Sequence, residues 1–318
     1  MEGSDFGLTL HLKNIIFMNK YFLLPLLLQM LIGSFCLGQT LSKVDIINQS
    51  LRKPTDKKVL VCAHRGDWRN APENSLQAVK NCIDMGVDIV EIDIQKSKDG
   101  HLILLHDETL DRATTGKGYA KDWTLDSIKT LRIRDGLTNP ANQSIPTLEE
   151  VLLLAKGKAM LYLDKADKHL PDMLALLDKM KMLDHAVFML PYTYEQAKSK
   201  FGNYLNRVIF IPRIEMSVED PQAFIEEYVK NFKPVAIQLR LPAEDSPRVD
   251  LIPIIQKQKM RVVVSTIWDY VSAYHDDDRA FHEPDAHWGW HVRGGVSIFN
   301  TDRPALLLDY LRKKGLHN

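Results

Sequence analysis

The sequence predicts a single α/β domain built as a closed barrel of eight parallel strands with helical crossovers, the (β/α)8 or TIM-type barrel. From residue 58 onward, short apolar runs alternate with amphipathic stretches, which is typical of parallel strands joined by helices. Nine runs have strand character, and two of them are joined by only six residues, too few for a crossover helix. A chain of 318 residues with 45% hydrophobic content can bury the core of one such barrel.

Residues 1–38 have the composition of a secretory signal peptide. The apolar run "YFLLPLLLQMLIGSFCLG" follows a lysine and ends at Gly38, after which the chain turns polar at Gln39. We expect cleavage at this point, a periplasmic or secreted protein, and no stable membrane anchor after cleavage. One alternative is an uncleaved anchor, because the apolar run is long enough to span a membrane. Another is lipid attachment at Cys36, although a bulky phenylalanine precedes it.

Residues 39–57 form a polar leader for which no regular structure is predicted, and residues 58–318 form the barrel domain. The second and third strand candidates enclose "QKSKDG", where Asp99-Gly100 is typical of a two-residue hairpin turn. The third candidate is therefore a hairpin arm at the second strand, and eight strands remain for the barrel. The strand candidates are 58–64, 87–94, 101–106, 159–165, 185–190, 207–212, 234–241, 261–267 and 295–299.

Helices are predicted between the strands from their N-terminal capping residues. Residues 107–146 are mostly polar and loop-like, with one short amphipathic piece at "TLDSIKTL". An excursion of this length belongs near the working face of a barrel. The predicted helix starts are Asn74-Ser75 for 75–85, Thr147 with Glu150 for "LEEVLLLAK", Asp220-Pro221 for "QAFIEEYVKNF" and Asp302 for "RPALLLDYLRKK".

Charge and cysteine content exclude two classes of protein. Lysine plus arginine and aspartate plus glutamate number 41 each, so no overall positive field favours nucleic acid or an anionic membrane. Any phosphate recognition therefore has to be local. After the signal segment only Cys62 and Cys82 remain, too few for a disulfide scaffold. Cys62 lies near the exit of a strand and Cys82 late in the helix that runs back, so we expect both to be unpaired, buried and inert.

Polar residues of catalytic type gather where the first two barrel strands end. Glu91 and Asp93 are two apart in a strand, so their carboxylates point to one side, where they repel each other unless a cation lies between them. The predicted two-residue turn would set His106 directly opposite Asp93. His64 and Arg65 end the first strand, at the face where such barrels carry catalytic groups. The ordinary alternatives are a solvated or salt-bridged carboxylate pair and a structural histidine at a strand end.

Three segments carry a resemblance that spans roughly residues 58–310: "AHRGDWRNAPENSLQAV", "GVDIVEIDIQKSKDGHLILLHDETLDRATTGKG" and "GGVSIFNTDRP". Together they resemble the glycerophosphodiester phosphodiesterases, a family within the phospholipase-C-like barrels. The resemblance implies that His64 and His106 are the acid/base pair and that Arg65 binds phosphate. It also implies that Glu91 and Asp93 hold one divalent metal ion, Ca²⁺ or Mg²⁺. Oxygen ligands suit such hard ions better than zinc.

The next barrel strand departs from the family's pattern. Members usually carry Glu-x-Lys there, with the glutamate as third metal ligand and the lysine on the phosphate, whereas this chain has "MLYLDKADKH". We expect Asp164 to be the third ligand. Lys165 is the candidate for phosphate binding, but alternation in a regular strand would point it to the other face. A bulge or twist would be needed to bring both side chains to the site.

Three tryptophans have two interpretations each. Trp268 follows the strand "VVVSTI" and is predicted at the working face, either as a substrate contact or as packing at the rim. Trp288 and Trp290, in "FHEPDAHWGWHVRGG", are predicted either to pack an outer helix or to line one wall of the substrate groove. The histidines of that segment suit no closed metal site well.

The residues and the resemblance together predict an enzyme, a metal-dependent glycerophosphodiester phosphodiesterase. It would hydrolyse a small-molecule glycerophosphodiester to glycerol 3-phosphate and an alcohol. Such a hydrolysis needs a cation on the non-bridging oxygens, a base for the nucleophile and an acid for the leaving alkoxide. The alternatives are phospholipase-C/D-like or lyase activity on another phosphodiester, and a barrel that binds without catalysis, since a fold does not guarantee an activity.

Overall fold

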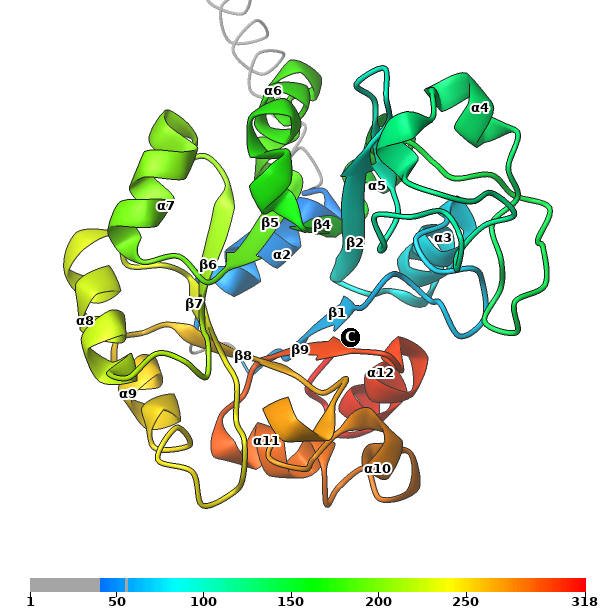
Figure 1. Cartoon of the computed structure of the whole chain (residues 1–318). Coiled ribbons are helices and arrows are strands. Elements are labelled where there is room, and N and C mark those ends of the chain that lie inside the picture. Colours follow the sequence, from blue (N-terminus) through cyan, green and yellow to red (C-terminus); the bar gives the residue numbers. More distant parts are fainter. Residues whose placement is uncertain (1–40, 55–56) are drawn as a thin grey trace, which may run out of the picture. The chain divides into compact units, whose positions relative to one another are not determined.

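Eight parallel strands close a barrel in the computed structural model, which describes residues 41–54 and 57–318. The strand β1 (Leu60–Ala63) pairs with both β2 (Ile89–Lys96) and β9 (Ile298–Thr301), and this double pairing closes the ring in Figure 1. The predicted (β/α)8 barrel is confirmed, and each of the nine strand candidates overlaps a strand. The remaining parallel strands are β4 (Met160–Asp164), β5 (Ala186–Leu190), β6 (Ile209–Ile214), β7 (Ala236–Leu239) and β8 (Arg261–Ser265).

The strand β3 (Leu102–Leu104) is antiparallel to β2, as predicted for a hairpin arm. Its register differs by one residue from the prediction: Asp93 lies opposite Leu105, whose backbone N–H donates to the carbonyl of Asp93 at 3.0 Å. The turn holds three residues instead of two, and the last is Gly100 with φ of 90°. The predicted pairing of Asp93 with His106 is therefore wrong, since one extra turn residue moves every later position by one.

Helices join the strands and cover the outside of the barrel (Figure 1). The predicted caps at Ser75, Thr147 and Asp220 are confirmed, and each side chain accepts a backbone N–H. The last helix has Arg303 as its cap residue, so the prediction that Asp302 caps it is wrong. The helices are α3 (Leu76–Met85), α5 (Leu148–Ala155), α6 (Leu170–Met180), α7 (Tyr194–Phe201), α8 (Pro221–Asn231), α9 (Leu251–Lys257), α10 (Asp277–His282), α11 (Trp288–Gly294) and α12 (Pro304–Lys313).

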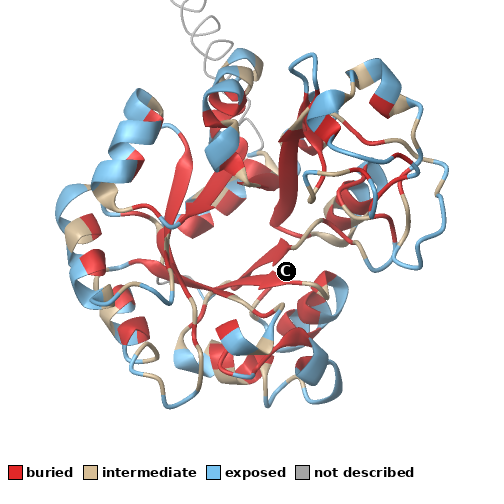
Figure 2. Ribbon diagram, in the orientation of Figure 1, coloured by how far each residue is buried: buried red, intermediate tan, exposed pale blue. Residues whose placement is uncertain are grey.

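A further helix, α2 (Lys43–Leu51), covers the N-terminal end of the barrel. It lies within the leader predicted to be irregular, and that prediction is wrong over this segment. The helix begins with a capping box between Ser42 and Asp45. Three of its apolar residues are fully buried among the inward-facing side chains of the strands; they are Val44, Ile47 and Leu51. Figure 2 shows the strands as buried elements and the outer faces of the helices as exposed.

The long segment between β3 and α5 packs beside the barrel with a small apolar core of its own. It contains the short helix α4 (Leu125–Lys129) at the predicted amphipathic piece. Its beginning supplies Asp107 and Arg112 to the working face, so the expected location is confirmed. The core residues are Ile103, Leu105, Leu110, Ala113, Ala120, Ile128, Ile133 and Ile145.

The predicted signal peptide, with Cys36 and the expected cleavage point, lies outside the described residues. Among the residues that are described, none belongs to a helix with the length and apolar character needed to cross a membrane. Cys62 and Cys82 are both buried and free, as predicted. Burial raises the pKa of both thiols, which disfavours the reactive thiolate.

Candidate active site

Side-chain alternation in the strands brings polar residues to the C-terminal end of the barrel. Ile89, Glu91 and Asp93 are successive residues on one face of β2, and the first of them belongs to the apolar base of the barrel. The neighbouring strand β4 is in register, so that Glu91 lies beside Tyr162 and Asp93 beside Asp164. The same inward face is therefore apolar at the base of the barrel and acidic at its top.

Glu91, Asp93 and Asp164 form one cluster, in which an oxygen from each carboxylate lies within 4.8 Å of the others. Glu91 and Asp93 are each 1% exposed. Burial and then the neighbouring carboxylates raise the pKa of Glu91 well above its ordinary value, and burial also raises the pKa of Asp93. Three acids this close together, two of them buried, favour a bound cation, and their oxygen donors fit Ca²⁺ or Mg²⁺. No second group of this kind occurs in the part of the chain that the structure describes.

His64 lies beside this cluster and is held by Asp302. The His64 Nδ1 and Asp302 Oδ1 atoms are 2.8 Å apart, and the indole N–H of Trp68 donates to the same oxygen at 2.6 Å. Burial alone would raise the pKa of Asp302, but the contacts with His64, Trp68 and Arg69 together outweigh it and lower the pKa. An ionised Asp302 can accept a hydrogen bond from Nδ1–H, so Nε2 is the ring nitrogen left for proton transfer. The fully buried Asp277 fixes the Asp302 backbone by accepting its N–H at 2.7 Å.

His106 has the same kind of partner. Its Nδ1 lies 2.6 Å from Asp107 Oδ1, and Arg112 Nε donates to the other oxygen of Asp107 at 2.8 Å. Hydrogen bonding from Arg112 lowers the pKa of Asp107 to about 2. The carboxylate therefore stays ionised and can accept a hydrogen bond from Nδ1–H of His106. Asp107 therefore orients His106, whereas the hairpin pairing that was expected to position His106 is not present.

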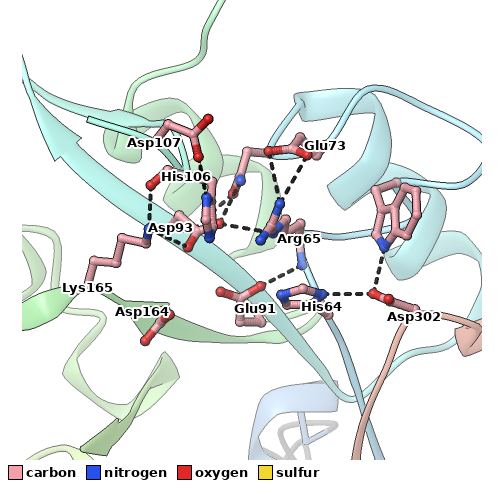
Figure 3. A network of polar contacts seen from close by, with 12 residues as sticks. His64, Arg65, Glu73, Glu91, Asp93, His106, Asp107, Asp164, Lys165 and Asp302 are labelled. Carbon is pink, nitrogen blue, oxygen red and sulfur yellow. Dashed lines mark hydrogen bonds and ion pairs between the residues drawn. The ribbon is translucent and has the colours of Figure 1, made fainter. Parts of the chain in front are cut away.

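Arg65 occupies the centre of the network drawn in Figure 3. Its backbone N–H donates to Glu91 Oε2 at 2.5 Å, and its guanidinium donates to both oxygens of Glu73 at 3.2 and 3.3 Å. This residue has a left-handed backbone with φ of 52°. The next residue, Gly66, has φ of 74°, and a Cβ there would lie 2.8 Å from the Cβ of Ala78. The glycine is therefore required for the turn that delivers Arg65 to the carboxylates.

Asn74 is a site residue that was expected only to open a helix. Its side-chain N–H₂ donates to Asp93 Oδ2 at 2.9 Å, and the backbone N–H of Asp93 donates to its side-chain oxygen at 2.9 Å. The neighbouring Glu73 accepts from Arg112 at 2.7 and 2.8 Å as well as from Arg65. The sequence signal for these contacts was the polar run "PENS". Its Ser75 alone caps the helix, so the polar side chains of Glu73 and Asn74 are free for other roles.

Lys165 reaches the site, contrary to the alternation argument. The strand β4 ends at Asp164, and Lys165 follows in a left-handed conformation with φ of 58°. Its ammonium donates to the carbonyl of His106 and lies 4.0 Å from Asp93 Oδ1. Figure 3 shows Lys165 and Asp164 entering the site from neighbouring backbone positions. The strand ends one residue earlier than expected, so Lys165 lies outside it. The alternation of side chains along a strand therefore does not apply to this lysine.

A pocket of about 210 Å³ opens beside the acidic cluster and is lined by His64, Glu91 and Asp164. Trp268 is 44% exposed on its wall, with its ring 6.2 Å from the ring of His64. Of the two interpretations given to Trp288 and Trp290, packing agrees with the structure and the groove wall does not, because neither residue lines this pocket. Trp288 is 1% exposed and packs in the core, and Trp290 stacks on a neighbouring histidine ring at 4.3 Å.

Solved structures share this architecture. A glycerophosphoryl diester phosphodiesterase from Parabacteroides distasonis superposes with a TM-score of 0.71 at 23% identity, over 86% of this chain and 93% of that one. An Oleispira antarctica phosphodiesterase, solved in complex with the product sn-glycerol-3-phosphate, gives 0.60 at 20% identity, over 80% and 96% of the two chains. At these identities the likeness establishes the fold.

Sequence comparison is more specific. A glycerophosphodiester phosphodiesterase from Caldanaerobacter subterraneus subsp. tengcongensis is 49% identical over 106 residues, which cover 33% of this chain and 43% of that protein. The matched segment thus spans less than half the length of that relative. The family model described as "Glycerophosphoryl diester phosphodiesterase family" matches residues 64–306, a range that contains every residue of the site described above. The chain therefore belongs to the glycerophosphoryl diester phosphodiesterase family.

Proposed function

We propose that this protein is a metal-dependent glycerophosphodiester phosphodiesterase, which hydrolyses its substrate to glycerol 3-phosphate and an alcohol. The observation that carries the proposal is the acidic cluster of Glu91, Asp93 and Asp164 beside a histidine whose tautomer is fixed by a carboxylate. Its sequence relatives include glycerophosphodiester phosphodiesterases, which supports the activity. The complex of the Oleispira antarctica protein with sn-glycerol-3-phosphate supports the product.

In this proposal the three carboxylates hold one Ca²⁺ or Mg²⁺ ion, which would neutralise charge on the non-bridging oxygens of the phosphate. Arg65 and Lys165 bind phosphate oxygens with positively charged donors. His64 and His106 transfer protons through Nε2, because Asp302 and Asp107 occupy Nδ1 of the two rings. One histidine activates the nucleophile, and the other protonates the leaving alkoxide.

The activity can be tested on glycerophosphoethanolamine with the purified protein and added Mg²⁺ or Ca²⁺. We expect one glycerol 3-phosphate for each diester consumed, measured by coupled oxidation with glycerol-3-phosphate dehydrogenase. Phosphoethanolamine or a cyclic phosphate as the product would favour the phospholipase-C-like or lyase alternative. Tight binding of the diester without turnover would favour a non-catalytic barrel.

Lys165→Met should lower kcat/KM for this substrate about 10- to 100-fold, the effect of losing a charged hydrogen-bond donor. The reason is that Lys165 lies 4.0 Å from a carboxylate of the acidic cluster, where its charge can reach the bound phosphate. Lys168→Met is the matched control, because this exposed lysine is three residues away and pairs with Glu108. Equal kcat/KM in wild type and Lys165→Met would contradict the assigned role.

We also propose that the protein is exported and carries no stable membrane anchor after processing. The support is the signal-like segment that ends at Gly38. N-terminal sequencing of protein recovered from the envelope of an expressing bacterium should begin at or near Gln39. Recovery of the intact N-terminus in the membrane fraction would contradict cleavage.

A further inference from the structure

One half of the pocket is not used by the proposed mechanism. It is formed by strands β6 to β9, and its polar residues continue the inward faces of those strands, as Glu91 does in β2. Each lies two or four positions beyond an apolar residue at the base of the barrel. These residues are Arg213, Gln238, Arg240, Ser265 and Asn300.

Two arginines give this half of the pocket a net positive charge. Arg213 Nε lies 2.6 Å from Glu215 Oε1, and Arg240 Nε lies 2.8 Å from Glu215 Oε2. Glu215 thus neutralises one of the two positive charges and pairs with one nitrogen, Nε, of each guanidinium. Among the described residues, these two arginines have a hydrogen-bond or ion-pair partner only at Nε, so their terminal nitrogens are available as donors to a ligand. Both side chains are mostly buried, at 19% and 28% exposed, so solvent screens their charge only in part.

Two amides add acceptors to the same surface. Gln238 and Asn300 are 5% and 6% exposed. Within the described part of the chain, the side-chain oxygens of both lack a hydrogen-bond partner. A buried acceptor without a donor costs free energy of folding. Two such acceptors in one pocket therefore indicate a ligand that supplies the donors. Hydroxyl groups can do this and can also accept from the two arginines.

We propose that this half of the pocket binds the alcohol portion of the diester and selects a polyhydroxylated alcohol, such as inositol, over a quaternary ammonium alcohol. The proposal rests on the proposed function. A polyol satisfies donors and acceptors together. A trimethylammonium group has no hydrogen to donate to Gln238 or Asn300, and its charge would lie beside Arg213 and Arg240.

The test compares kcat/KM for glycerophosphoinositol and glycerophosphocholine in the full-length protein. Wild type should favour the inositol ester at least about tenfold. Arg240→Gln should reduce that ratio about tenfold, because it removes one charged donor and part of the repulsion. Gln238→Leu should lower kcat/KM for the inositol ester more than for the choline ester. This variant provides the test if Arg240→Gln does not fold. Arg207→Gln is the control, since this exposed arginine precedes β6 at the other end of the barrel and pairs with Asp178.

The outcomes separate this proposal from the proposed function. If wild type releases glycerol 3-phosphate from both esters with equal or choline-favouring kcat/KM, the polyol assignment is wrong and the function stands. An equal loss on both esters in Arg240→Gln would mean that the pocket holds the glycerol they share, which also overturns it. No product from either ester would overturn the proposed function itself.

Discussion

Glu91→Gln should lower turnover on the order of 1000-fold and remove the response of the protein to Ca²⁺ or Mg²⁺. Glu91 is tightly confined, because it is 1% exposed and accepts the backbone N–H of Arg65 at 2.5 Å. The amide has nearly the same shape but contributes no charge to the cation. Wild type with its metal removed by excess EDTA should be equally inactive, and added Mg²⁺ or Ca²⁺ should restore only wild type.

Thermal unfolding gives a second measurement that does not depend on turnover. Burial and the neighbouring carboxylates raise the pKa of Glu91, so the metal-free folded protein keeps a proton that the unfolded chain releases. Its stability should therefore fall as the pH rises from the unfolded value of about 4.3 towards the raised folded pKa. A cation needs the ionised carboxylates, so the rise in Tm on adding metal should be larger at pH 8 than at pH 6.

The matched control for this experiment is Asp172→Asn. Asp172 is an exposed carboxylate on α6 whose partner is Lys96, and it lies outside the acidic cluster. This variant should keep both the metal-dependent rise in Tm and the activity. A wild-type rise in Tm in Glu91→Gln would show that the cation binds elsewhere. Full activity of wild type in excess EDTA would show that the reaction needs no cation.

The sequence predicted those features that depend on short-range pattern. Apolar runs with capping residues between them located the strands and most helices, because both signals are local. Alternation then placed Glu91 and Asp93 on one face, and the family resemblance added Asp164. The structure brings the oxygens of all three within 4.8 Å of one another. The end of the first apolar run placed His64 at the end of β1. These positions follow from chain order once the barrel is assumed.

The errors arose where a single residue decides the outcome. One additional turn residue changed the β2–β3 register, and one left-handed backbone at Lys165 brought a side chain into the site. Neither is encoded in a periodic pattern. Asp302 and Asn74 were given capping roles, but their side chains bind partners that are distant in sequence, at His64 and Asp93. Local propensity cannot separate a cap from a contact that only the closed barrel creates.

The helix α2 is a related case. Its three buried apolar residues lie within a helix of only 9 residues, which is too short a pattern to predict a helix in a polar segment. The helix is stabilised by the apolar base of the barrel, which it covers, with Leu60 and Ile89 in the same cluster. The surface that selects the helix is itself assembled from strands spread along the chain.

His64→Ala should reduce kcat on the order of 100-fold or more while the substrate still binds, since general acid/base catalysis typically contributes that much. Its imidazole has Nδ1 directed to Asp302 at 2.8 Å, which leaves Nε2 for proton transfer. Asp302→Asn should lower kcat less than His64→Ala and shift the pH profile, because an amide no longer fixes the tautomer. His282→Ala, on the exposed surface of α10, should leave kcat unchanged.

The roles of the two histidines can be separated with a substrate that has a p-nitrophenol leaving group, which needs little protonation on departure. If His106 is the acid for the leaving alkoxide, kcat of His106→Ala should recover on this substrate by at least about tenfold relative to His64→Ala. The reverse pattern would exchange the two roles, which the equivalent carboxylate contacts at Asp107 and Asp302 allow. Recovery in neither variant would mean that leaving-group protonation does not limit the rate. Wild-type kcat in both variants on both substrates would mean that the histidine pair is structural, and the acid/base mechanism proposed for this barrel would be wrong.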